Sequence, residues 1–416
     1  MKPYEKYKDS GVEWLGEIPE HWEVNKFKRL FVEKKKQTNV NLNCGSISYG
    51  KVVYKDDERI PEATKRSYQV LSKGDFLINP LNLNYDLISL RIALSDIDVV
   101  VSSGYIILQN RIKLDKNYYK WLLLIFDVVY MKTLGAGVRQ TLSFTHLANC
   151  ELVFPTLKEQ IAIAHFLEDK TAKIDQAIAI KQQQIELLKE RKQIIIQEAV
   201  TKGLDKTVKM KDSGVEWIGE IPEHWEILPG LRFFRENKRT NKGMKESKVL
   251  SLSYGNIIIK PEEKLVGLVP ESFETYQIVF PDDIIIRCTD LQNDQTSLRT
   301  GLAKNKGIIT SAYINISIIG ENHPEYLHSY LHFVDITKVL YRFGSGLRQN
   351  LSFSDFKRMP ILKVPFNEQL QIVEFLQKAS LKIEKAIEMQ LKEIEKLKEY
   401  KLSLIDGVVT GKVKVC

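Results

Sequence analysis

The chain repeats itself once over most of its length, and this repeat constrains the fold more than any other feature. The segment KDSGVEWLGEIPEHWE at residues 8–23 returns at residues 211–226 with a single Leu-to-Ile change. Further matches follow in the same order, among them GAGVRQTLSF at 135–144 and GSGLRQNLSF at 344–353. A period of about 205 residues is several times longer than that of a solenoid repeat. We therefore interpret the chain as a tandem duplication of a domain-sized unit.

Each repeat unit begins with a globular part of about 150 residues. In this part, short runs rich in β-branched residues alternate with turn residues, and one apolar helical stretch is expected near residues 117–133. The runs expected to form strands are 47–53, 99–108, 257–259 and 284–286. We therefore predict an α+β protein that contains two α/β domains in tandem.

A long helix follows each globular part, from about Lys158 to Val200 and from about Asn367 to Val409. Apolar residues recur in both helices at seven-residue spacing, which is typical of a coiled-coil seam. Polar residues interrupt the two seams at matching heights. Because the first helix delivers the chain to the second domain, we expect the helices to pair antiparallel. The predicted seam residues are Leu167, Ile174, Ile178, Ile185, Leu188 and Ile195 in the first helix, and Leu376, Ile383, Ile387, Ile394, Leu397 and Leu404 in the second.

This organisation gives the chain four parts related by an internal pseudo-two-fold axis. The predicted boundaries place a globular domain at 1–155, a helical region at 156–203, a second globular domain at 204–364 and a second helical region at 365–416. Two related but non-identical domains, held apart by a rigid coil, are suited to binding a target that has two separate parts.

Composition narrows the cellular setting and the class of partner. The chain carries 61 Lys and Arg against 53 Asp and Glu, and the net charge of +8 is a moderate indication of a polyanionic partner. It contains no apolar run long enough to cross a membrane and no apolar leader at its start. The four cysteines are too widely spaced for a CxxC motif or a disulfide framework. We expect a reduced, cytoplasmic protein.

The search for a catalytic motif finds only incomplete ones. The glycines at 135–137 and 344–346 lack the third glycine of a dinucleotide or methyl-donor loop. His328 and His332 have helical spacing, but no Glu follows His328 as a zinc protease motif requires. We therefore expect a binding protein that has no metal site and no catalytic residue.

Basic and aromatic residues of the globular parts are the candidates for contact with nucleic acid. Arg and Gln can contact base edges or phosphate, and a base-reading pair should differ between the copies if the two domains read different sequences, so base readout is the less favoured alternative. We therefore expect these pairs to contact the DNA backbone or to support the domain, and the paired tryptophans to join domain and helix. The full candidate set is Lys34, Lys35, Lys36, Tyr49, Lys51, Lys65, Arg66, Arg139, Gln140, Lys238, Arg239, Lys242, Tyr254, Arg287, Arg348 and Gln349.

The combination of motifs resembles one protein family. A DSGVEWLGEIPEHWE segment opens each domain, a GxGxRQxLSF segment closes it, and a Pro-x-x-x-Glu-Gln-x-x-Ile lead-in (Pro155 to Ile163) precedes the helix. Together they are similar to the specificity subunit of type I restriction–modification systems, over essentially the whole chain. The lead-in departs from the usual Pro-Pro of the family, with Pro155-Thr-Leu in the first copy and Pro365-Phe in the second.

The resemblance implies two target recognition domains that each read one half of a bipartite site in double-stranded DNA, joined by an antiparallel coil. It also implies a non-catalytic chain that binds no cofactor. Two modification subunits would bring S-adenosylmethionine and methylate adenine, and restriction subunits would bring ATP, Mg and DNA cleavage. The alternatives are a coiled-coil scaffold without DNA recognition, which would show no salt-dependent DNA binding, and a stand-alone DNA-modifying enzyme, which would bind S-adenosylmethionine.

Overall fold

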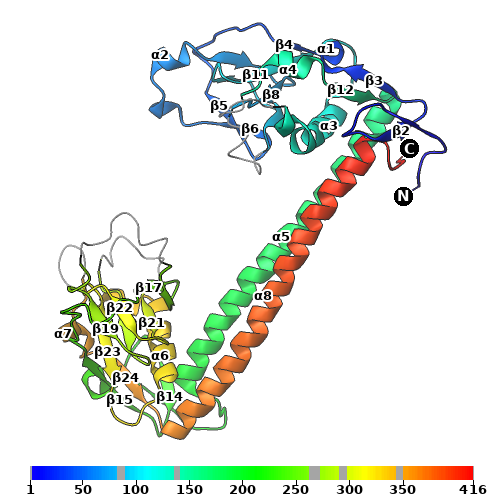
Figure 1. Ribbon diagram of the computed structural model, residues 1–416. Helices are drawn as coiled ribbons and strands as arrows, with labels where there is room; N and C mark the ends of the chain where they lie inside the picture. Colours follow the sequence, from blue (N-terminus) through cyan, green and yellow to red (C-terminus); the bar gives the residue numbers. More distant parts are fainter. Residues whose placement is uncertain are drawn as a thin grey trace. The chain divides into compact units, whose positions relative to one another are not determined.

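The computed structural model describes residues 2–81, 90–134, 141–261, 272–289, 298–342 and 350–415. The chain forms two compact units (Figure 1), each made of one globular domain and part of each long helix. Unit 1 comprises Met1–Gln182 with Leu391–Cys416, and unit 2 comprises Gln183–Gln390. The division between the units therefore falls inside the two long helices.

The main sheet of each unit has four antiparallel strands in the same order. In unit 1 the order is β4 (Phe31–Glu33), β11 (Ile106–Asn110), β8 (Phe76–Ile78) and β9 (Ile92–Leu94). In unit 2 it is β16 (Phe234–Glu236), β23 (Ile314–Ile318), β20 (Ile284–Ile286) and β21 (Thr300–Leu302). One helix packs against the last strand of each sheet, α3 (Lys116–Val129) in unit 1 and α6 (Pro324–Ile336) in unit 2. The sequence repeat is thus also a repeat of topology.

Both faces of the main sheet are buried. In β8, Phe76 and Ile78 belong to the large core beneath α3, whereas Leu77 between them belongs to a second, smaller core on the other face. Because side chains alternate across a strand, burial on both faces requires a continuous apolar run. The smaller core lies beneath the strands β5 (Gly45–Ser48), β6 (Lys51–Tyr54), β7 (Gln69–Leu71) and β10 (Val99–Val101). Their counterparts in unit 2 are β17 (Leu250–Ser253), β18 (Asn256–Ile259), β19 (Gln277–Val279) and β22 (Gly307–Ile309).

Two of the predicted strands are each divided by a turn. The run at 47–53 is a hairpin of β5 and β6, because Tyr49 and Gly50 take positive φ values of 48° and 71° and reverse the chain. The run at 99–108 contains β10 and the first part of β11, with the turn between Ser102 and Tyr105. The remaining two runs form strands as predicted, within β18 and as β20.

Short elements connect each main sheet to the long helices. The tryptophan-rich segment of each unit forms a small hairpin and leads into a two-stranded ribbon. The hairpin pairs β1 with β2 and the ribbon pairs β3 with β12; in unit 2 the equivalent pairs are β13 with β14 and β15 with β24. The bounds are β1 (Tyr7–Asp9), β2 (Glu17–Pro19), β3 (Glu23–Lys26), α1 (Phe27–Leu30), α2 (Glu62–Lys65), α4 (Phe144–Ala148), β12 (Glu151–Phe154), β13 (Met210–Asp212), β14 (Glu220–Pro222), β15 (Glu226–Pro229), α7 (Phe353–Phe356) and β24 (Pro360–Lys363).

The two long helices are α5 (Leu157–Lys202) and α8 (Phe366–Val409). Within unit 1 the early part of α5 pairs with the late part of α8, since Asp175 contacts Lys401 and Lys181 contacts Glu393. Within unit 2 the late part of α5 pairs with the early part of α8, since Lys192 contacts Glu384. As the α5 number rises, the α8 number falls, so the helices are antiparallel in each unit. All twelve predicted seam residues lie in buried or half-buried positions.

The last turn of α8 in unit 1 takes the place that the last turn of α5 takes in unit 2. The hydroxyl of Tyr118 donates to the carbonyl of Val409 at 2.8 Å. In unit 2 the hydroxyl of Tyr326 donates to the carbonyl of Val200 at 3.3 Å. Figure 1 marks the two ends of the chain close together, and a β-bridge joins Lys2 to Lys414. No helix in the described ranges combines the length and the apolar character needed to cross a membrane.

Candidate nucleic-acid interface

The second tryptophan of each repeated segment joins the globular domain to a long helix, whereas the first, Trp14 or Trp217, packs on aromatic residues of α3 or α6 and their ends. Trp22 and Trp225 are both fully buried. The indole of Trp22 donates to Glu159 of α5 at 3.1 Å, and that of Trp225 donates to Glu368 of α8 at 3.0 Å. Burial opposes ionisation of Glu159, but hydrogen bonds, first among them that from His21, hold its pKa below the ordinary value. These rings are therefore unavailable for stacking on bases.

Lys34 is used inside the fold of unit 1. Its ammonium group lies 2.6 Å from Asp75 and 2.9 Å from the hydroxyl of Ser72. The side chains of Lys34 and Asp75 are only 10% and 7% exposed. A buried carboxylate requires a charged partner, and Lys34 supplies it. The expectation that Lys34 contacts phosphate is therefore not supported.

In unit 2 the guanidinium of Arg239 pairs with a buried aspartate, as the ammonium group of Lys34 does in unit 1. Its guanidinium makes two hydrogen bonds of 3.0 Å to Asp283 and lies 4.6 Å from the ring centre of Phe280. Asn237 adds a third bond to this carboxylate at 3.0 Å. The two units thus stabilise equivalent buried aspartates with different side chains, and Arg239, like Lys34, is engaged in an internal ion pair.

Two further predicted cations are paired close to α2. Lys65 lies 2.8 Å from Asp57, whose pKa is lowered by the hydrogen bond from Lys65 and then by the backbone amide of Cys44. Arg66 lies 2.8 Å from Glu62 in a pair whose side chains are 71% and 69% exposed. Because exposed pairs contribute little to stability, Arg66 can exchange Glu62 for a phosphate, whereas Lys65 is held more firmly.

The remaining predicted cations differ in how freely they can reach a ligand. Lys35, Lys36, Lys51 and Lys242 are exposed, and none of them makes an ion pair within the described ranges. Lys238 is also exposed and lies 3.3 Å from Glu236. Arg287 is half-buried, and its backbone pairs with Arg299. Arg139, Gln140, Arg348 and Gln349 lie outside the described residues.

Tyr49 and Tyr254 are the most exposed large hydrophobic side chains among the described residues of the two globular domains, at 92% and 90%. Each stands in the two-residue turn of a hairpin, between β5 and β6 in unit 1 and between β17 and β18 in unit 2. The free lysine Lys51 begins β6, two residues after Tyr49. The turn of unit 1 therefore brings together one predicted aromatic residue and one predicted cation.

Sequence reasoning missed a buried arginine in each unit. Arg91 and Arg299 are 4% and 0% exposed. Their backbone amides each donate at 2.5 Å to an aspartate of the neighbouring helix, Asp127 in unit 1 and Asp335 in unit 2. The guanidinium of Arg299 donates to the carbonyl of Thr289 at 2.9 Å. The signal was available in the sequence, because an Asp occurs at the same place in both apolar helical stretches.

Other chemistry is sparse in the described ranges. They contain no group of three or more His, Cys, Asp or Glu side chains that could hold a metal ion. The rings of His328 and His332 lie 6.4 Å apart on α6, and burial lowers the pKa of each to about 4. Both are therefore neutral near pH 7, as expected of histidines packed within the fold.

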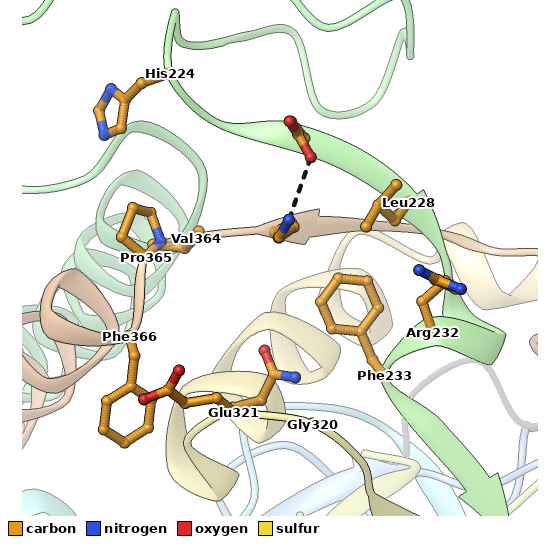
Figure 2. A pocket seen from close by; sticks show the side chains of 12 residues that line it. His224, Leu228, Arg232, Phe233, Gly320, Glu321, Val364, Pro365 and Phe366 are labelled. Carbon is orange, nitrogen blue, oxygen red and sulfur yellow. Dashed lines mark hydrogen bonds and ion pairs between the residues drawn. The ribbon is translucent and has the colours of Figure 1, made fainter.

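A cavity of about 500 Å³ opens in unit 2 where β15, β24 and the start of α8 meet (Figure 2). Its wall carries side chains of both charges, including the ion pair between Glu226 and Lys363 at 3.5 Å. Arg232 and Glu321 also line it, with the ring of Phe366 at one side. The lining residues include no pairing of a nucleophile with a base.

Comparison with known proteins identifies relatives over the full length. Residues 19–190 match the family model of the type I restriction modification DNA specificity domain. The putative type I restriction enzyme MjaX specificity subunit of Methanocaldococcus jannaschii is 24% identical over 432 residues, which cover 96% of each chain. The MjaVIII specificity subunit of the same organism is 24% identical over 336 residues, covering 76% of this chain and 75% of the relative.

Solved structures share the fold. One comes from work on complex assembly and conformational transition of the type I R-M system, and it matches with a TM-score of 0.66 at 12% identity, covering 95% of this chain and 99% of that one. The HsdS subunit from Thermoanaerobacter tengcongensis matches with a TM-score of 0.51 at 14% identity, covering 95% and 98%. The arrangement of two α/β domains and two long helices is therefore a known fold.

Proposed function

We propose that this chain, which is similar to the specificity subunits of type I restriction–modification systems, shares their function. In this proposal the chain binds double-stranded DNA at a bipartite target. The globular domain of unit 1 reads one half of the target and that of unit 2 reads the other. The pair of long helices sets the number of base pairs between the two halves.

One observation carries this proposal: the two units share a framework but differ on their surfaces. Strand order, the Trp–Glu joint and the buried aspartate recur in both. Among the predicted cations, the exposed lysines without an ion pair differ in position: unit 1 has Lys35, Lys36 and Lys51, and unit 2 has Lys242. A common framework with different exposed side chains is suited to binding two different DNA sequences in the same orientation relative to each domain.

We further propose that the chain itself catalyses no reaction. Modification subunits would dock on the long helices and supply S-adenosylmethionine chemistry, and restriction subunits would supply ATP-dependent cleavage with Mg. Exposed apolar side chains on α5 support such docking, since Ile180, Leu187 and Ile194 are 49%, 56% and 49% exposed at seven-residue spacing. The assembly would act in the cytoplasm, where its DNA substrate lies.

A binding selection tests the proposal and identifies the target sequence in the same experiment. The full chain, alone and together with its modification subunit, is incubated with duplexes that contain 40 random base pairs, and the bound DNA is sequenced. We expect enrichment of two short motifs at a fixed separation, with affinity falling steeply as salt is raised. Exchange of the first globular domain for that of a relative should change one motif only. Enrichment of no motif, or of one uninterrupted motif, would contradict the proposal.

A further inference from the structure

The two hairpin turns present the same residue to solvent. Tyr49 and Tyr254 each precede a glycine, in the sequence Ser-Tyr-Gly. The pairing of Ser48 with Lys51 in unit 1 and of Ser253 with Asn256 in unit 2 leaves a loop of two residues in each hairpin. Neither tyrosine hydroxyl has a hydrogen-bond partner in the described part of the chain. The fold therefore makes no use of either ring.

Tyrosine is a costly choice at this position. The φ values are 48° and 71° at Tyr49 and Gly50, and 47° and 76° at Tyr254 and Gly255. Two successive positive φ values define a hairpin turn in which Asn-Gly is strongly favoured and a bulky first residue is strained. Glycine suits the second turn position because a φ of 71° is rarely adopted by other residues, and a Cβ on Gly50 would also lie 3.0 Å from the Leu90 side chain. The tyrosine is not required by the turn, yet both copies have it.

Each hairpin is anchored by an inward apolar side chain and carries exposed apolar residues along its second strand. Val52 and Ile257 point inward and are 6% and 8% exposed. The outer residues that follow them are open to solvent: Val53 at 37% and Tyr54 at 59% in unit 1, and Ile258 at 44% and Ile259 at 47% in unit 2. A strained aromatic residue on a firmly anchored, exposed apolar hairpin is typical of a binding element.

The positive charge of both hairpin segments favours a polyanionic partner. Residues 43–55 and 247–260 each contain two lysines and no carboxylate, although acidic residues make up 53 of the 416 positions in the chain. A two-stranded ribbon of this width fits a DNA groove. An aromatic ring can stack on any base, so the same residue can serve two half-sites of different sequence. Apolar side chains that enter the base stack also kink the duplex.

We propose that Tyr49 and Tyr254 insert into the DNA beside their half-sites and stack on base pairs without reading the sequence. This inference rests on the proposed DNA-binding function and adds a contact mode to it. The ring supplies affinity and bends the duplex, while neighbouring side chains of each globular domain supply specificity.

The test replaces each tyrosine with the residue that the turn prefers. Full-length chains carrying Tyr49→Asn, Tyr254→Asn or both are compared with the Phe variants at the same positions. The DNA is the duplex that the wild-type chain enriches from the random pool, labelled at its two ends for energy transfer. We expect each Asn variant to lose affinity on the order of tenfold, which is the effect of losing one aromatic stack. Energy transfer should report a smaller bend, and the Phe variants should behave as wild type.

Three readouts separate the possible outcomes. The Asn variants should unfold at the same or a higher temperature than wild type, whereas a structural role for the rings would lower it. Selection with the double Asn variant should enrich the same two motifs as wild type, and a changed motif would instead mean that the rings read bases. Unchanged affinity and bend, with loss of binding to the modification subunit, would overturn the inference. Failure of the wild-type chain to enrich any motif would count against the proposed function itself.

Discussion

Lys401 of α8 contacts both carboxylate oxygens of Asp175 of α5, at 2.7 Å each. The internal repeat makes this pair equivalent to the pair of Lys192 with Glu384, which lie 2.8 Å apart. Lys192 of α5 aligns with Lys401 of α8, and Asp175 of α5 aligns with Glu384 of α8. The polar interruptions in the two apolar seams are therefore met by acidic partners on the facing helix. Partially exposed pairs of this kind add little stability but favour one register, since any shift would leave the lysines unpaired.

A fragment of residues 1–208 should form an antiparallel homodimer through α5. The repeat places Asp175 of a second copy where Glu384 lies in the intact chain, so Lys192 keeps an acidic partner. The pair of Lys181 with Glu393 is lost, because the residue equivalent to Glu393 in α5 is Gln184. Gln184→Glu should therefore strengthen the dimer by about 0.5–1 kcal/mol over its two symmetric pairs.

Sedimentation equilibrium at low salt measures this difference as a lower dissociation constant for the fragment carrying Gln184→Glu. The matched control is Gln183→Glu, which adds the same charge at the exposed neighbouring position. An equal effect of both substitutions would show that net charge, and not the inferred register, governs association. A purely monomeric wild-type fragment would contradict the expected pairing.

Helix length should determine the separation of the two DNA motifs. Deleting residues 183–189 together with 386–392 removes seven residues from each helix and keeps Lys181, Glu393, Lys192 and Glu384. The helices shorten by ~10 Å, which corresponds to about three base pairs. Sequencing of selected DNA should show both motifs unchanged and closer together. Deletion from α5 alone keeps the seven-residue phase but makes the two helices unequal, so the Lys181–Glu393 and Lys192–Glu384 pairs cannot both form and stability should fall.

Lys34 and Lys36 should differ in what they contribute, although both are lysines of one short segment. Lys34→Met leaves the buried Asp75 carboxylate without its cation and should lower the free energy of unfolding by about 3 kcal/mol. Lys36→Met should leave stability unchanged and reduce the slope of log K against log salt by about one unit if Lys36 contacts phosphate. Urea denaturation and binding titrations at several salt concentrations measure the two effects, and the reverse assignment would refute the prediction.

Acidification should destabilise unit 2 through His328 and His332. Their pKa of about 4 in the folded chain lies below the ordinary 6.5, so the unfolded state binds more protons between these values. Their contribution to stability is full above pH 6.5 and is lost as the pH falls toward 4. At pH 5 the loss should be about 2–4 kcal/mol for the pair relative to pH 7.

Calorimetry at pH 7 and pH 5 detects this loss in the unfolding of unit 2. The double variant His328→Gln, His332→Leu should be less stable at pH 7 but should lose much less stability on acidification. His165→Gln, which alters an exposed histidine of α5, serves as the control and should keep the wild-type pH dependence. An unchanged pH dependence in the double variant would place the acid sensitivity elsewhere.

The duplication, the long helices and the resemblance to a family were accessible from the sequence because each leaves a pattern along the chain. An almost identical 16-residue segment marks the repeat, and seven-residue spacing of apolar residues marks the seam. The same reasoning merged β5 with β6 and β10 with β11, because each pair is joined by a turn of only a few residues inside an apolar run. Local patterns of hydrophobicity determine which segments are helix or strand, but they record short turns poorly.

The tertiary structure decided which charged and aromatic residues remain available for binding. Lys34, Lys35 and Lys36 are consecutive and chemically equal in the sequence, yet only Lys34 meets a buried carboxylate that lies about 40 residues further along the chain. Tyr49 and Tyr105 each have a glycine as a direct neighbour, Gly50 after the first and Gly104 before the second. Tyr49 is nevertheless almost fully exposed, whereas Tyr105 packs against the smaller core. Periodicity determined the long helices and the apolar runs that form strands. The exposure and pairing of a side chain depend on residues far away in sequence, which only the folded chain brings together.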